Sequence, residues 1–152
     1  MGEADRQRLL KNLRRVAGLG PQGWYDLIRA SVELALARRL MGSRTTKELI
    51  EAADVGAQSG SSDSLSDDQR SVIRRVAFAV PCAGARVPWR ADCLVQALAA
   101  QRWLRQEGIP TTLHIGARKE TAAEFEAHAW LMQGDTMVTG DNGKDFTTLM
   151  AP

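Results

Sequence analysis

Residues 91–117, ADCLVQALAAQRWLRQEGIPTTLHIGA, contain the signals of a helix start, a helix end and a strand in close succession. Asp92 is a favourable N-cap residue. Apolar side chains recur behind it on one helix face, at Leu94, Ala97, Leu98 and Leu104. Gly108 and Pro110 then follow in the order expected at a helix C-terminus. The alternating run TTLHIGA predicts a strand, so Cys93 is expected at the entrance of a helix that leads into a sheet.

Two more strands are predicted downstream of this unit. AHAWLM (residues 127–132) and TMVTG (136–140) have strand character, and QGD (133–135) between them is a hairpin-turn signal. The C-terminal half is therefore expected to contain one helix followed by a small antiparallel sheet.

The N-terminal half reads as helical. Residues 4–41 predict two helices broken at GLGPQG (18–23). The second is expected to bury apolar side chains at helical spacing, namely Trp24, Leu27, Ile28, Val32, Leu36 and Leu40. A short helix is predicted over 45–54, and the Gly-, Ser- and Asp-rich residues 55–69 predict a loop.

A further helix is predicted from the capping box of Ser66 and Gln69 to Val80, with Pro81 as its end. Its inward side chains are expected to be Val72, Ile73, Val76 and Val80. The fold class is thus α+β, with a helical region (1–80) and a second part (81–152) forming one compact domain overall.

Composition limits the class of protein. The chain has 152 residues, 44% of them hydrophobic and 25% charged, which is typical of one globular domain. The formal net charge of +2 does not indicate a nucleic-acid-binding protein. The N-terminus lacks the apolar core of a secretory signal, and the long apolar stretch 24–41 carries charges that disfavour a membrane span. We therefore expect a cytoplasmic protein whose two cysteines are thiols.

Cys93 is expected where a thiolate is stabilised. A free thiol has a pKa of about 8.5, and a helix N-terminus favours the anion because it carries about half a positive charge and unpaired amide donors. Asp92 opposes this effect unless its carboxylate is committed to capping. Cys93 is therefore a candidate nucleophile, although burial as a structural thiol is the more common role of a lone cysteine.

A nucleophilic thiol needs a base, and the chain offers His114 and His128. The imidazole needs in turn a carboxylate or amide to orient it. If Gly134 and Asp135 form the hairpin turn, counting outward places His128 opposite Asp141, and opposed side chains have Cβ atoms roughly 4.5–5.5 Å apart. Asp141 is therefore the candidate orienter. A longer loop would shift this register, whereas Asp135 lies in the turn and points away.

A resemblance to a known family emerges from these residues. CLVQALAAQRWLRQEGIPTTLHIGA followed by AHAWLMQGDTMVTGD resembles the leader peptidase of lasso peptide biosynthesis, a separate-chain protease of the transglutaminase-like superfamily. It is similar to the C-terminal domain of microcin-maturation proteases. The similarity covers residues 81–149 and depends on the Cys-Leu helix start, the glycine after the helix, the HIG strand and AHAW in this order.

The resemblance implies a transglutaminase-like or papain-like core in which one catalytic helix packs on a small antiparallel sheet. It implies Cys93 as the nucleophile, His128 as the general base and then acid, and Asp141 as the orienter. The implied reaction removes the leader from a ribosomally made lasso peptide precursor, with no metal or organic cofactor. A small leader-recognition protein is the implied partner, and the lasso cyclase is a further candidate partner.

Other interpretations stay open. The same triad could transfer an acyl group to an amine, or the fold could serve as a non-catalytic binding module. Cys82, in a predicted loop, is expected to be structural, and its spacing from Cys93 does not fit common zinc sites. Trp89 is either a second oxyanion donor or a core or lid aromatic, and His114 is expected to be a packed or surface residue. The helix over 24–41 is expected to be core, with docking of the recognition partner as the alternative.

Overall fold

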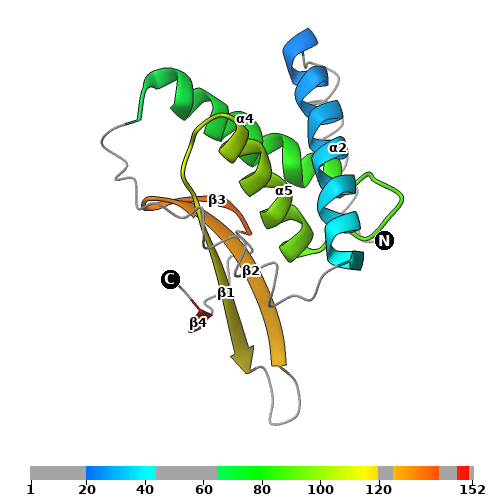
Figure 1. Cartoon of the computed structure of the whole chain (residues 1–152), viewed down its shortest axis with the longest axis vertical. Helices are drawn as coiled ribbons and strands as arrows, with labels where there is room; N and C mark the ends of the chain where they lie inside the picture. Colours follow the sequence, from blue (N-terminus) through cyan, green and yellow to red (C-terminus); the bar gives the residue numbers. More distant parts are fainter. Residues whose placement is uncertain (1–19, 44–64, 120–124, 141–146, 151–152) are drawn as a thin grey trace, which may run out of the picture.

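The computed structural model describes residues 20–43, 65–119, 125–140 and 147–150. Its elements, in chain order, are α2 (Pro21–Ser43), α4 (Asp67–Gly84), α5 (Cys93–Gln106), β1 (Thr112–Lys119), β2 (Phe125–Gln133), β3 (Thr136–Thr139) and β4 (Thr147–Met150). Three helices gather beside a small sheet (Figure 1), which confirms the α+β class. The helices predicted before residue 18 and over 45–54 lie outside the described residues, as does Asp141.

The sheet has four antiparallel strands in the order β3-β2-β1-β4. β1 pairs with β2 along its whole length, with Leu113 opposite Leu131 and Gly116 opposite His128. β4 pairs with the other edge of β1. The sequence predicted the first three strands, whereas β4 was not expected.

The hairpin between β2 and β3 confirms the turn and corrects the register. Gly134 and Asp135 form the turn, with Gly134 at φ 53°. The two residue pairs next to the turn, Gln133 with Thr136 and Met132 with Met137, are the pairs predicted by counting outward from it. The count fails beyond Met132, because the register shifts there and Leu131 pairs with Thr139. Such a shift adds one residue to one strand of an antiparallel pair.

The counting argument for the orienter is therefore wrong. β3 ends at Thr139, and the shifted register does not place Asp141 opposite His128. Because Asp141 lies outside the described residues, its role as orienter stays a prediction.

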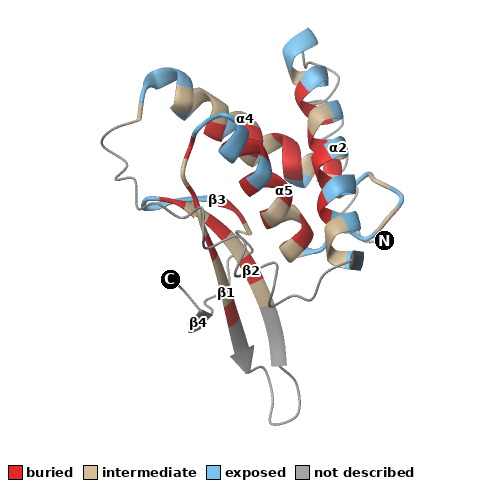
Figure 2. Cartoon of the chain, in the orientation of Figure 1, coloured by how far each residue is buried: buried red, intermediate tan, exposed pale blue. Residues whose placement is uncertain are grey.

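The core lies where α4 and α5 pack on one face of the sheet and α2 packs on these two helices. Trp103 of α5 is 1% exposed and packs in one cluster with side chains of α2 and α4 and with Leu113, Leu131 and Val138 of the sheet. Figure 2 shows the buried residues on the facing sides of the helices and at alternating positions along β1 and β2. This alternation is that of a sheet with one face on the core.

Helix α4 begins as predicted and ends later than predicted. Ser66 Oγ accepts a hydrogen bond from the Gln69 amide, and the Gln69 side chain accepts one from the Ser66 amide, so the capping box is confirmed. Pro81 does not end the helix, which continues to Gly84 with Pro81 exposed on its surface. A proline removes one backbone donor, and the carbonyl of Pro81 still accepts from the Ala85 amide in the following turn. Cys82 therefore lies in a helix and not in a loop.

Helix α2 buries a face other than the predicted one. Leu27 is buried as expected, but Trp24, Ile28, Val32 and Leu36 are exposed. The inward face consists of Asp26, Leu27, Ala30, Glu33, Leu34 and Ala37. Small side chains let neighbouring helices approach closely, and the two buried acids find partners on those helices.

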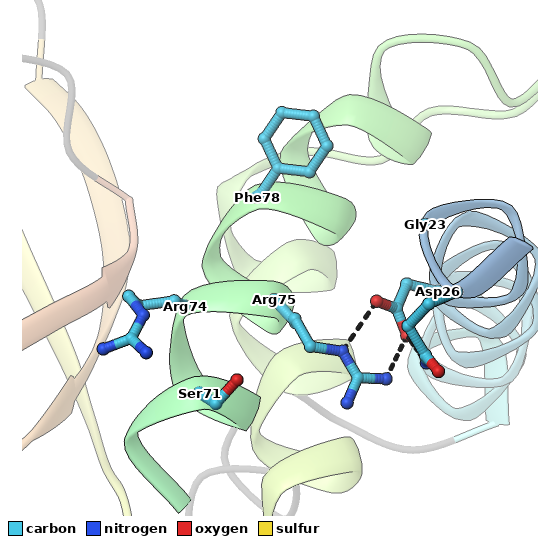
Figure 3. Close-up of a pocket in the computed structure, with 7 residues that line it drawn as sticks. Gly23, Asp26, Ser71, Arg74, Arg75 and Phe78 are labelled. Atoms are coloured by element: carbon cyan, nitrogen blue, oxygen red, sulfur yellow. Dashed lines mark hydrogen bonds and ion pairs between the residues drawn. The ribbon is translucent and has the colours of Figure 1, made fainter. Parts of the chain in front are cut away.

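The two buried acidic residues of α2, Asp26 and Glu33, form ion pairs with α4 and α5. Arg75 of α4 donates two hydrogen bonds to the Asp26 carboxylate, one of them at 2.8 Å (Figure 3), and this raises the pKa of Arg75 above its ordinary value. Arg102 Nε of α5 lies 2.9 Å from Glu33 Oε2. A buried carboxylate needs such a partner, so these pairs fix which face of α2 points inward.

Candidate active site

The entrance of α5 has the predicted cap. Asp92 Oδ1 accepts a hydrogen bond from the Val95 amide at 3.1 Å, so its carboxylate is committed to capping. Cys93 is the first helical residue, a half-buried free thiol. The amides of Cys93 and Leu94 have no intrahelical acceptor at this position. The entrance therefore combines a thiol with backbone donors and the positive end of the helix dipole.

The first turn of α5 is held against the end of α4. Gln96 Nε2 donates to the Ala91 carbonyl at 2.7 Å. A Cβ at Gly84 would lie 3.2 Å from the same nitrogen, so a larger residue in the last turn of α4 would require the Gln96 side chain to shift by a few tenths of an ångström. Gly84 was not singled out from the sequence. Cys82, two residues earlier, is a free thiol that packs against the hydrophobic core.

His128 of β2 has an oriented imidazole. Its Nε2 lies 2.5 Å from the Gly140 carbonyl oxygen. A carbonyl oxygen only accepts hydrogen bonds, so Nε2 carries the proton, and Nδ1 of the neutral ring is the basic nitrogen. The orienting acceptor described by the structure is thus a backbone carbonyl, one residue before Asp141.

Gly140 is a site residue that sequence reasoning missed. Its φ is 96°, a conformation that favours glycine, and a Cβ there would lie 2.5 Å from Trp130 Cβ and 2.8 Å from the Ala129 carbonyl oxygen. The chain after β3 can therefore cross close to β2 only with glycine at this position. A glycine directly after a strand and directly before the candidate Asp141 was the available signal.

Three rings line one face of the β1–β2 pair. The His114 and Trp130 rings stack at a centroid distance of 5.6 Å, and the Trp130 and His128 rings lie 6.2 Å apart. Burial lowers the pKa of His114, because desolvation disfavours the imidazolium. His114 is therefore a packed residue, as expected, and it supports the ring beside His128.

The sheet register determines where His128 points. Leu131 packs in the core shared with the helices, and side chains alternate along a strand, so His128 and Trp130 lie on the opposite face of β2. Helix α5 packs against the core face of β2. Among the hydrogen bonds of the described residues, none joins the Cys93 thiol to the imidazole. Their pairing stays a prediction.

Trp89 lies in the loop before α5. Its indole Nε1 is buried, and within the described residues it has no hydrogen-bond partner. Such a donor is expected to find an acceptor, so Trp89 stays a candidate for the second oxyanion donor.

The described residues contain no group of three or more His, Cys, Asp or Glu side chains that could hold a metal ion.

A pocket of about 330 Å³ lies away from these residues, between α2 and α4 (Figure 3). The Asp26–Arg75 pair spans it, while the Arg74 and Phe78 side chains point in other directions. Its lining comprises Gln22, Gly23, Asp26, Ser71, Arg74, Arg75 and Phe78. None of the candidate catalytic residues belongs to it.

Comparison with known proteins gives one match. A family model described as the transglutaminase-like superfamily matches residues 28–151, which is most of the chain. No curated protein and no solved structure matches significantly.

No helix in the described residues has both the length and the apolar character that a bilayer span requires.

Proposed function

Because the chain belongs to the transglutaminase-like superfamily, we propose that it is a cysteine peptidase that removes the leader from a ribosomally made lasso peptide precursor. The observation that carries the proposal is Cys93 at the capped entrance of α5, within the matched region. Both cysteines are free thiols, which suits work in the reducing cytoplasm.

The proposed nucleophile is the Cys93 thiolate. It attacks the scissile carbonyl carbon, and the negative charge passes to the carbonyl oxygen. The Cys93 amide at the helix entrance donates to this oxyanion, and the Trp89 indole N–H is the proposed second donor. Asp92 does not compete for the amide of Cys93, because its carboxylate accepts from Val95.

The proposed base is Nδ1 of His128. It takes the thiol proton and gives it to the leaving amine as the C–N bond breaks. It then takes a proton from the water that hydrolyses the thioester and returns it to the thiolate. The Gly140 carbonyl holds Nε2 in the tautomer that this requires, and Asp141 is the proposed carboxylate that stabilises the imidazolium.

The thiol and the ring must approach each other for this chemistry. Catalytic hydrogen bonds often tighten only in the substrate complex. In our proposal a small leader-recognition protein binds the leader and delivers the scissile bond to the Cys93 thiol at the entrance of α5. The lasso cyclase then uses the freed amine of the core peptide.

The test is to incubate the chain with a precursor peptide and its leader-recognition protein and to weigh the products. Free leader and free core peptide, lost in Cys93→Ala and kept in Cys82→Ala, are the expected result. Intact precursor with every combination of components would contradict the proposal, as would undiminished cleavage by Cys93→Ala.

A second function can be tested in the same assay, because the family match is to transglutaminase-like proteins as a group. An acyltransferase on the same residues would join the thioester to an amine instead of water. Adding a small primary amine separates the two functions. A mass increase equal to the amine minus ammonia, on a glutamine of the peptide, would favour the acyltransferase.

A further inference from the structure

Helix α2 exposes a continuous row of large apolar side chains, which we name the α2 stripe. Trp24, Tyr25, Ile28, Val32 and Leu36 are 52%, 57%, 64%, 53% and 37% exposed. They recur at intervals of about one helical turn, so they lie along one side of the helix. Monomeric proteins seldom expose such a row, and those that do commonly use it for association.

The stripe cannot be buried by turning α2 about its axis. The opposite face carries Asp26 and Glu33, whose carboxylates are held by Arg75 and Arg102. Rotation would break both pairs and leave buried charges without partners, which is strongly destabilising. The stripe therefore needs a partner from outside the packed core of α2, α4 and α5.

The stripe is large enough for self-association. Roughly half of about 200 Å² is accessible on each of its five side chains, so it presents roughly 500 Å². If all of this area were covered, two copies would bury on the order of 1,000 Å² together, about the threshold for a biological interface. Nearby atoms on the same helix, such as those of the exposed Ala35, add to this area.

The charges on α2 select the orientation. Both of its acidic residues are buried, and its exposed charges, Arg38 and Arg39, lie at the C-terminal end. Two parallel copies would bring these arginines together. In antiparallel copies they lie at opposite ends, each beside the Trp24 and Tyr25 rings of the other copy, where cation–π contact is favourable.

The spacing of the stripe fits an antiparallel pair. With a two-fold axis midway between Ile28 and Val32, Ile28 of each copy lies opposite Val32 of the other, and Trp24 lies opposite Leu36. Such an interface is isologous, and each apolar side chain meets another. We propose that two copies of this chain associate through the α2 stripe in this antiparallel register.

The experiment measures the mass of the full chain by sedimentation equilibrium over a range of concentrations. The chain has a mass of 16.6 kDa, and the expected result is a concentration-dependent rise to twice this value. Ile28→Lys and Val32→Glu are each expected to weaken dimerisation at least tenfold. Met137→Glu is the matched control, because Met137 is an exposed apolar residue on β3 and its replacement should leave the dimer intact.

Mixing the two variants tests the partner and the register. Ile28→Lys and Val32→Glu chains should form a mixed dimer more tightly than either variant associates with itself, since the introduced ammonium of one copy faces the introduced carboxylate of the other. Circular dichroism confirms that the variants fold. Failure of the mixture to dimerise overturns the register. A monomeric parent chain at all concentrations overturns the proposal, and so does a dimer that both substitutions leave intact.

Discussion

The two halves of the candidate site are positioned by different kinds of interaction. Cys93 is placed by its neighbours in the sequence, through the Asp92 cap and the start of α5. His128 is placed by residues from other strands, through pairing with Gly116 and through the carbonyl of Gly140 beyond a shifted register. The setting of Cys93 could therefore be predicted from local signals, whereas the strand register and the Gly140 contact that orient His128 could not.

The largest effect is expected in the helical half. Cys93→Ala should reduce leader removal by at least about 10⁴-fold, because it deletes the nucleophile. Cys82→Ala is the matched control and should change the rate less than twofold, since Cys82 packs against the core near the end of α4. Single-turnover cleavage followed by mass spectrometry measures both. Equal rates in the two variants would remove the basis for treating the helix entrance as catalytic.

In the sheet half, Gly140→Ala should be severe. The added Cβ meets the Trp130 side chain and the Ala129 carbonyl, and φ at this position is 96°. We expect a loss of about 3 kcal/mol in the free energy of unfolding. Gly108→Ala is the control, because Gly108 has a φ of 70° but nothing lies within 4 Å of the added Cβ. It should lower the free energy of unfolding by about 1 kcal/mol. Urea unfolding measures both, and similar losses would mean that the crossing at Gly140 is not tight.

A smaller effect is expected from the cap. Asp92→Ala removes the acceptor of the Val95 amide and should lower the free energy of unfolding by about 1 kcal/mol. Asp92→Asn keeps an acceptor and should stay within about 0.5 kcal/mol of the parent chain. It also removes a negative charge next to Cys93 and should speed alkylation of that thiol by iodoacetamide. Slower alkylation in Asp92→Asn would show that the carboxylate does more than cap the helix.

The smallest effect concerns pH. Burial lowers the pKa of His114, so the folded protein favours the neutral ring, whereas the unfolded chain takes up a proton near pH 6.5. Stability should therefore fall as pH drops below that value. His114→Phe should flatten this dependence between about pH 7.5 and 5.5, measured by thermal unfolding. An unchanged slope would indicate that other groups are responsible.

The sequence predicted features that depend on near neighbours. The Ser66 capping box, the Asp92 cap, the end of α5 just before Gly108 and the turn at Gly134 all follow from a few adjacent residues. Local signals also predicted the first three strands and hence the fold class.

Features decided by distant residues were mispredicted. The inward face of α2 is selected by Arg75 and Arg102, which lie on other helices and cannot be read from the period of α2 alone. The register shift at Leu131 is a property of the strand pair. Because of it, counting outward from the turn placed Asp141 opposite His128 wrongly. Pro81 lies inside α4, which continues to Gly84 although a proline was expected to end it. The predicted pairing of Cys93 with His128 depends on how the helix entrance and the sheet meet, which no local signal specifies.

The most direct test of the account is the rate at which iodoacetamide alkylates Cys93 at about pH 6, in the parent chain and in His128→Ala. An imidazolium beside the sulfur preserves the thiolate in acid, so the parent chain should react at least tenfold faster than His128→Ala, while Cys82 reacts equally in both. Peptide mass spectrometry distinguishes the two cysteines. Equal alkylation of Cys93 with and without His128 would contradict the account.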